Sequence, residues 1–189
     1  MKDNFKTIPF LIAICIIGFT SVLKAQSTYK IADSKNNNMK LSGTSTLHDW
    51  TMNAQVFTSE AQFVLAGRQI SSLKGLSFSL AVADLKSGEN GLDKNAYKAL
   101  KTKSITYKLS SATINNDVIK THGMLTIAGV TKEVIIDVHA VINADETITC
   151  TGSEKLNMTD YQVKPPKFML GAMKTGDAVT LDFTLVYKK

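Results

Sequence analysis

The stretch STLHDWTM, residues 45–52, holds the side chains whose types come closest to those of an active site. Ser45, His48 and Asp49 are the three residue types of a hydrolase triad, in which the carboxylate must orient the imidazole. If residues 48–56 form a strand, successive side chains point to opposite faces, so His48 and Asp49 face away from each other. Unless a bulge rotates the strand here, the spacing excludes a triad, and we predict no catalytic residue.

The same strand would place His48 at the end of an inward-facing row with Trp50, Met52 and Val56. A cavity for an amphipathic molecule has mostly apolar walls and a few polar groups that hold the head group. His48 at the mouth of such a cavity suits this second task and is a candidate ligand contact. The alternative is a structural histidine hydrogen-bonded to backbone near the rim, and the sequence favours that alternative.

Other chemistry finds little support in the residue types. A metal site needs several converging ligands, but His48, His122 and His139 are far apart and form no HxH or HxxxH pair. Glycine-rich phosphate-binding loops are absent from the sequence, so we predict no metal and no cofactor. Cys150 alternates with threonines in ETITCTG, which favours a core position over a nucleophile.

The first residues have the pattern of a secretory signal peptide. Two lysines in MKDNFK precede an apolar run from Ile8 to Phe19, and the small residue Ala25 follows. The run is shorter than the roughly 20 residues of a comfortable membrane span. We therefore expect residues 1–25 to be removed and the protein to be periplasmic or secreted, without a stable membrane span. An uncleaved anchor is the alternative.

Charge and length limit the remaining classes. Without residues 1–25, Lys and Arg fall from 22 to 19 and Asp and Glu from 16 to 15, so the formal charge falls from +6 to +4. The lysines are scattered, which argues against a nucleic-acid partner. Residues 26–189 are long enough for one domain with a sizeable core, and we predict a single domain. The sequence leaves a homodimer open.

Alternation of apolar and polar residues dominates the rest of the chain and predicts an all-β protein. The long alternating segments are 75–82, 104–110, 132–142 and 177–187, and shorter strands fit 61–66, 125–127 and 147–150. Only residues 92–101 have apolar side chains at helical spacing, and we predict one short helix there. About eight strands with one wet and one dry face indicate an antiparallel barrel or sandwich.

The segment 158–177 interrupts this pattern. Pro165 and Pro166 exclude a regular strand or helix around them. Phe168 and the apolar residues that follow it would lie in a connecting loop. They could plug the core or form a flexible lid over the mouth of a barrel, and the sequence favours neither.

Four segments together are similar to the YceI-like family of exported bacterial proteins. They are STLHDWTM, GLDKNAYKALKTKSITYKL, GMLTIAGVTKEVIIDV and KLNMTDYQVKPPKFMLGAMKTGDAVTLDF, in the order of the family, across residues 40–187. The resemblance implies a lipocalin-like antiparallel β-barrel with a helix inserted between strands. It also implies that a polyisoprenoid or another long-chain amphipathic molecule is bound inside, with no catalytic residue.

On this basis, the predicted function is non-catalytic carriage of a polyisoprenoid, an isoprenoid quinone or a fatty-acid-like lipid. The inward rows would line the cavity, with His48 at its mouth. The predicted ligand-binding residues are His48, Trp50, Met52, Phe78, Leu80, Tyr107, Val138, Phe168, Leu181 and Phe183.

Two alternatives stay open. One is a lipid-modifying enzyme on the same barrel with His48 as general base, which needs a second group such as Asp160 or Tyr161 close to it. The other is a structural or stress-related exported module whose barrel is filled by its own side chains. A hollow between the inward rows favours carriage, and rows packed solidly against one another favour the filled module.

Overall fold

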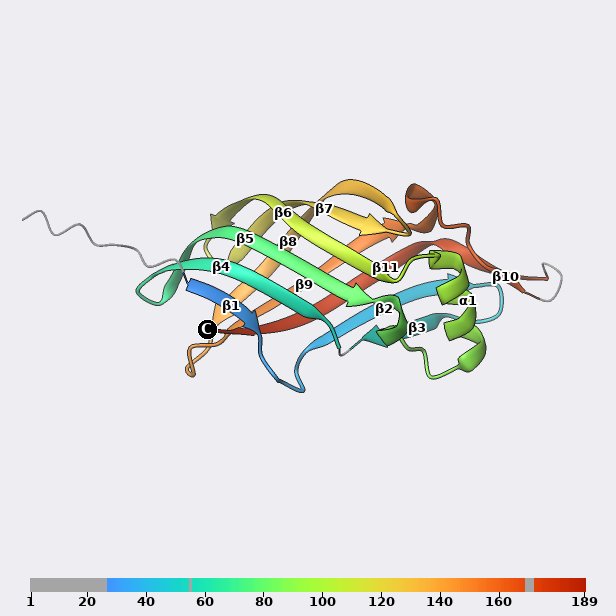
Figure 1. Cartoon of the computed structure of the whole chain (residues 1–189), viewed down its shortest axis with the longest axis horizontal. Helices are drawn as coiled ribbons and strands as arrows, with labels where there is room; N and C mark the ends of the chain where they lie inside the picture. Colours follow the sequence, from blue (N-terminus) through green and yellow to red (C-terminus); the bar gives the residue numbers. More distant parts are fainter. Residues whose placement is uncertain (1–26, 55, 169–171) are drawn as a thin grey trace, which may run out of the picture.

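The computed structural model of the protein describes residues 27–54, 56–168 and 172–189. Most of this chain is β-strand, joined by short turns and one α-helix (Figure 1). The strands are β1 (Ser27–Ile31), β2 (Asn38–Ser45), β3 (Trp50–Ala54), β4 (Thr58–Ala66), β5 (Gln69–Ala81), β6 (Ser104–Asn115), β7 (Val118–Ile127), β8 (Val130–Ile142), β9 (Ile148–Asn157), β10 (Lys167–Phe168) and β11 (Met173–Lys188). The helical segments are the 3-10 turns η1 (Val82–Asp84) and η2 (Met158–Tyr161) and the α-helix α1 (Asn90–Leu100).

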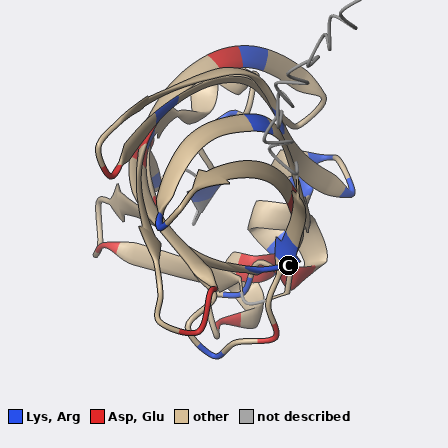
Figure 2. Ribbon diagram, turned by 90° about the vertical axis from the view of Figure 1, so that its left-hand side faces the viewer, with Lys and Arg blue, Asp and Glu red and all other residues tan. Residues whose placement is uncertain are grey.

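Eight of the strands close into an antiparallel barrel, seen end-on in Figure 2. Their order around the barrel is β1, β4, β5, β6, β7, β8, β9 and β11. β1 completes the ring because it pairs with two partners: Thr28 lies opposite Gln62 of β4, and Lys30 lies opposite Lys188 of β11. Closure leaves no free edge along these pairings, which protects the sheet from edge-to-edge association. The predicted all-β barrel with one inserted helix is confirmed.

The hairpin of β2 and β3 widens the barrel wall at the end farthest from the C terminus (Figure 1). β2 pairs with β11, and β3 pairs with β2. The outer edge of β3 continues into the segment before α1, because Asn53 and Lys86 exchange two backbone hydrogen bonds of 2.7 and 2.8 Å. The barrel wall therefore continues from β3 to the segment around Lys86, which leads into α1.

Helix α1 lies at this same end of the barrel. The carboxylate of Asp93 accepts hydrogen bonds from the backbone N–H and the hydroxyl of Ser87 at 2.8 and 2.7 Å, and these bonds lower its pKa. The hydroxyl of Tyr97 lies 3.0 Å from the carbonyl oxygen of Leu85 and ties the helix to the preceding segment. The predicted helix is confirmed, although it begins two residues before residue 92. No helix in the described part of the chain combines the length and apolar character needed to cross a membrane.

The faces of the strands follow the predicted alternation. Leu76, Phe78 and Leu80 of β5 face the interior. On β8 the outward row is solvent-exposed, with Ile135 and Val141 exposed by 51% and 54%.

Aromatic side chains fill the end of the barrel near the C terminus. Phe63 is 2% exposed and makes edge-to-face contacts with Tyr29 and Tyr187, with ring centroids 5.4 and 5.7 Å apart. The hydroxyl of Tyr187 lies 2.7 Å from that of Ser59. The buried amide of Asn37 donates to the Ala32 carbonyl at 2.6 Å and accepts from the Val186 N–H at 2.7 Å. This end is therefore sealed by a packed core.

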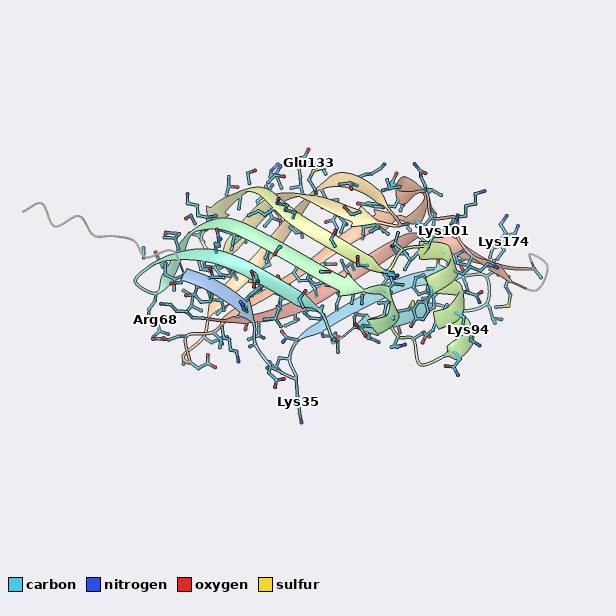
Figure 3. The ribbon with its side chains drawn as sticks, viewed as in Figure 1. Lys35, Arg68, Lys94, Lys101, Glu133 and Lys174 are labelled. Atoms are coloured by element: carbon cyan, nitrogen blue, oxygen red, sulfur yellow. The ribbon has the colours of Figure 1, made fainter. Side chains whose placement is uncertain are left out.

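Charged side chains lie mainly on the outside of the barrel (Figure 3). The figure labels six that point away from it: Lys35, Arg68, Lys94, Lys101, Glu133 and Lys174. Three of these, Lys94, Lys101 and Lys174, lie at the α1 end. Most residues that line the interior of the barrel are apolar.

Several boundaries differ from the prediction. The expected inward placement of Val56 is wrong: the residue follows the end of β3 and is 67% exposed. The proline segment, expected to hold no regular structure, is flanked by η2 and by the two-residue strand β10. The predicted signal peptide and residues 169–171 of the predicted loop lie outside the described residues.

Candidate functional site

The barrel encloses a cavity of about 130 Å³ with almost entirely apolar walls. The inward rows of β5, β6, β7, β8, β9 and β11 form these walls. Phe63 and Tyr187, which belong to the aromatic core at the sealed end, also border it. The inward rows are thus not packed solidly against one another. A hollow between these rows is what the carriage hypothesis requires.

A second apolar cavity, of about 110 Å³, lies beneath α1. Leu92, Ala96 and Leu100 of the helix contribute to its wall. Trp50 and Met52 of β3 line it from the hairpin. The helix is therefore a side wall of a cavity as well as a connection between strands.

The two cavities adjoin. Five residues line both: Leu41, Leu85, Ile105, Ile127 and Leu156. The hollow thus extends from the aromatic core at the sealed end to the helix at the other end. Such an elongated apolar space suits a chain-like molecule better than a compact one.

Eight of the ten residues predicted to bind ligand line these cavities. Phe78, Leu80, Tyr107, Val138, Leu181 and Phe183 border the first cavity. Trp50 and Met52 border the second. Phe168 lies in β10, and the structure does not describe its side chain.

His48 lies apart from both cavities. It is exposed in the turn before β3, and its Nδ1 lies 2.8 Å from the backbone oxygen of Asp49. Ser45 donates its hydroxyl to the His48 carbonyl at 2.7 Å and accepts the backbone N–H of Leu47 and His48 at 3.2 Å. Ser45 and His48 therefore build a local turn, because their side-chain polar atoms lie within hydrogen-bond distance of backbone atoms. This matches the structural role that the sequence favoured for His48.

The candidates for a second catalytic group lie elsewhere. Asp160 pairs with Lys132 at 3.7 Å, and Tyr161 is buried beside the second cavity. Neither contributes to the polar contacts of His48. Within the described residues, His, Cys, Asp and Glu also form no group of three that could hold a metal.

Two aromatic rings of the cavity wall pack against glycines of the neighbouring strands. A side chain at Gly123 would collide with the ring of Tyr107, and one at Gly152 would collide with the ring of Phe183. Glycine at each position lets an aromatic ring cross from its own strand onto the next. Tyr107 and Phe183 are thus held against the neighbouring strands, and both line the first cavity.

Glu154 is a lining residue that the sequence analysis missed. It lies on β9, in the same inward row as Cys150, and borders the first cavity. Burial raises the pKa of its carboxyl, and the negative charge of Asp137 raises it further. The predicted strand ended at residue 150, and continuing its alternation four residues would have placed Glu154 inside.

A family model for the YceI-like domain matches residues 25–187 of this chain. The protein belongs to the YceI-like family. Because the match covers most of the sequence, it confirms the resemblance identified from the four sequence segments. None of the curated proteins compared with the chain matches it.

Solved structures of YceI-like and related proteins share the fold. BcnA of Burkholderia cenocepacia is 18% identical, with a TM-score of 0.62 over 78% of this chain and 95% of that one. A polyisoprenoid binding domain from Saccharophagus degradans, implicated in plant cell wall breakdown, is 12% identical, with a TM-score of 0.63 over 85% and 97%. The YceI protein of Campylobacter jejuni is 19% identical, with a TM-score of 0.53 over 69% and 81%.

The segments that carry the YceI-like resemblance meet near the second cavity. The backbone N–H and the hydroxyl of Thr159 donate to the carboxylate of Asp177 at 2.9 and 2.6 Å, which joins MTDY to TGD. Asp160 pairs with Lys132, which joins MTDY to GVTK. Tyr161 of the same turn is buried beside the cavity. These family segments therefore brace one side of the hollow.

Cys150 should be unreactive in the folded YceI-like protein. The thiol is buried, and burial raises its pKa from 9.0 to about 12. At pH 8 the folded protein should react with iodoacetamide at least about a hundredfold more slowly than the unfolded chain, because the thiolate is the reactive form. Mass spectrometry of alkylated protein with and without urea measures this. Equal rates in both states would contradict the core position.

The raised pKa also fixes the direction of a pH effect. The unfolded thiol ionises from about pH 9 upward, whereas the folded thiol stays protonated until about pH 12. The contribution of Cys150 to stability is therefore complete below pH 9 and is lost as the pH rises toward 12.

Proposed function

We propose that the protein binds and carries a long-chain apolar or amphipathic molecule inside the barrel, without catalysis. The candidate ligands are a polyisoprenoid, an isoprenoid quinone or a fatty-acid-like lipid. The observation that carries the proposal is the pair of adjoining apolar cavities between the sealed end and α1. The polyisoprenoid binding domain of Saccharophagus degradans, which has a similar fold, supports the same ligand class.

Burial of an apolar chain supplies the driving force for binding. Each buried CH₂ group contributes about 0.8 kcal/mol, so roughly ten of them contribute about 8 kcal/mol before the cost of ordering the chain. A net binding free energy of about 8 kcal/mol corresponds to a dissociation constant of about 1 μM, so micromolar affinity requires more than about ten buried CH₂ groups once the cost of ordering the chain is subtracted. The hollow can therefore retain a ligand without a strong polar contact.

We further propose that the protein is exported and that it carries its ligand as a single domain. Residues 1–25 have the pattern of a cleaved signal peptide, which supports a periplasmic or secreted location. Residues 26–189 would then be the mature domain, which closely agrees with the bounds of the family match. The exposed turn around His48 favours a carrier over the alternative enzyme, because His48 borders neither cavity.

Trp50 provides a direct test of carriage. It is the only tryptophan of the chain and lines the second cavity, so a ligand that fills the hollow changes its surroundings. Titration with geranylgeraniol should change its fluorescence in a saturable way at micromolar concentration with one ligand per chain. A short alcohol such as butanol serves as control and should have no such effect. Unchanged emission with every long-chain compound tried would contradict carriage.

A further inference from the structure

The outer side of α1 carries a stripe of lysines. Lys94 and Lys98 lie four residues apart and Lys101 follows three residues later, so the three share one side of the helix. Leu92 and Ala96 lie on the opposite side and line the second cavity. All three lysines are exposed, and none of them forms an ion pair with a described residue. Figure 3 shows Lys94 and Lys101 pointing away from the barrel.

A second pair of lysines lies on another side of the same cavity. Lys167 of β10 and Lys174 of β11 stand directly opposite each other in the ladder between these strands, and both are exposed. Like charges in this position repel each other, and an anion placed over them removes the repulsion. Their neighbours Pro166 and Thr175 line the second cavity, as α1 does. The cavity is therefore flanked by basic side chains from two separate elements.

An exposed apolar side chain accompanies this pair. Leu47 is 64% exposed in the turn between β2 and β3. Its neighbour Thr46 binds the backbone of Lys174 twice: the Thr46 N–H donates to the Lys174 carbonyl at 3.0 Å, and the Thr46 hydroxyl accepts the Lys174 N–H at 3.1 Å. A single exposed leucine is common on protein surfaces. An apolar side chain among lysines, however, is the combination that binds the interface of an anionic membrane.

Acidic residues at this end offset the lysines only in part. Asp93, the only acidic residue of α1, is buried and accepts its hydrogen bonds from the segment before the helix. Asp177 of β11 accepts two hydrogen bonds from Thr159, so its carboxylate faces the protein. Asp49 and Glu89 are exposed and would be repelled by an anionic surface. We therefore expect attraction that is weak and sensitive to salt.

We propose that this end of the barrel docks on a membrane surface rich in anionic lipid. The docking face consists of Leu47, Lys94, Lys98, Lys101, Lys167 and Lys174. The lysines attract the lipid head groups, and the leucine enters the interface. Docking in this orientation places α1 and the second cavity next to the membrane. The inference goes beyond the proposed carriage and does not require it, because only the outer surface takes part.

Sedimentation with lipid vesicles tests the docking. One set of vesicles contains phosphatidylglycerol and phosphatidylcholine in equal parts, and the other contains phosphatidylcholine alone. At low salt the purified exported chain should bind the anionic vesicles at least about tenfold more tightly than the neutral ones. This binding should be lost in about 1 M sodium chloride, where charges act over only about 3 Å.

Substitutions in the docking face should weaken this binding. Each lysine near an anionic surface contributes about a fivefold factor in affinity. The triple variant Lys94→Gln, Lys98→Gln and Lys101→Gln should therefore bind the anionic vesicles about a hundredfold more weakly. Leu47→Ala should weaken binding by about tenfold, because carbon atoms that enter the interface are lost.

A second triple variant serves as the matched control. Lys74→Gln, Lys108→Gln and Lys155→Gln remove the same charge from exposed positions on β5, β6 and β9. These positions lie on the side of the barrel, so binding should stay within about threefold of wild type. An equal loss in both triple variants would show attraction by net charge alone and would overturn the docking face. Equal binding of wild type to anionic and neutral vesicles, or binding to neither, would also overturn it.

Discussion

Replacement of Val138 by tryptophan should abolish high-affinity binding of long-chain ligands. Val138 lines the first cavity from β8. An indole there occupies space that the ligand chain needs and would exclude about four CH₂ groups, each worth about 0.8 kcal/mol. The affinity for geranylgeraniol should therefore fall by more than about 100-fold. Native mass spectrometry during a ligand titration measures the loss.

Val141→Trp is the matched control on the same strand. Val141 lies on the outward row and is 54% exposed, so the same indole should leave binding within about twofold of wild type. Circular dichroism would confirm that both variants fold. Ala96→Trp adds a second block from α1, beside the other cavity. If Val138→Trp and Ala96→Trp both bind geranylgeraniol as wild type does, the ligand does not lie in this hollow.

Replacement of Phe63 by alanine should have the largest effect on stability. The ring is 2% exposed and contacts Tyr29 and Tyr187 at the sealed end of the barrel. Truncation of a buried phenylalanine in a tightly packed core costs about 3–5 kcal/mol, because the space left behind is only partly refilled. Urea unfolding measures the loss of free energy.

The control for this change is Leu47→Ala. Leu47 is 64% exposed in the turn before β3, and its loss should change the free energy of unfolding by less than about 0.5 kcal/mol. An unfolding midpoint of Phe63→Ala equal to that of wild type would show that the aromatic residues at the sealed end contribute little. The barrel would then depend on closure of the sheet more than on this core.

The long strands could be predicted because each alternates over many residues. Val134, Ile136 and Val138 repeat every second position, which specifies both the strand and its inward face. β1, with the sequence STYKI, was missed by the sequence analysis. Its part in closure depends on simultaneous pairing with β4 and β11, which no local pattern reveals.

β2 was missed for a different reason. In NMKLSGTS the inward row places Gly43 after Met39 and Leu41, so a glycine stands where an apolar side chain would signal a strand. The structure supplies that side chain from the next strand, since the ring of Trp50 lies over Gly43. An apolar side chain therefore does occupy the space inward of Gly43, but it belongs to Trp50 and not to β2.

The cavity walls were more predictable than its polar groups. Trp50 and Met52 were placed correctly because apolar residues at alternate positions must share the dry face. Val56 was placed wrongly because the chain leaves the strand after Ala54. Glu154 escaped notice because a charged residue in a short polar stretch, TGSEKLN, is usually solvent-exposed.

Native mass spectrometry of the gently purified protein, followed by organic extraction, tests carriage most directly. We expect one bound molecule per chain, released into the organic phase as a long-chain compound of defined mass. The stripped protein should take up added geranylgeraniol with the same stoichiometry. A ligand-free mass under gentle conditions, with no uptake of any added isoprenoid, would contradict the account.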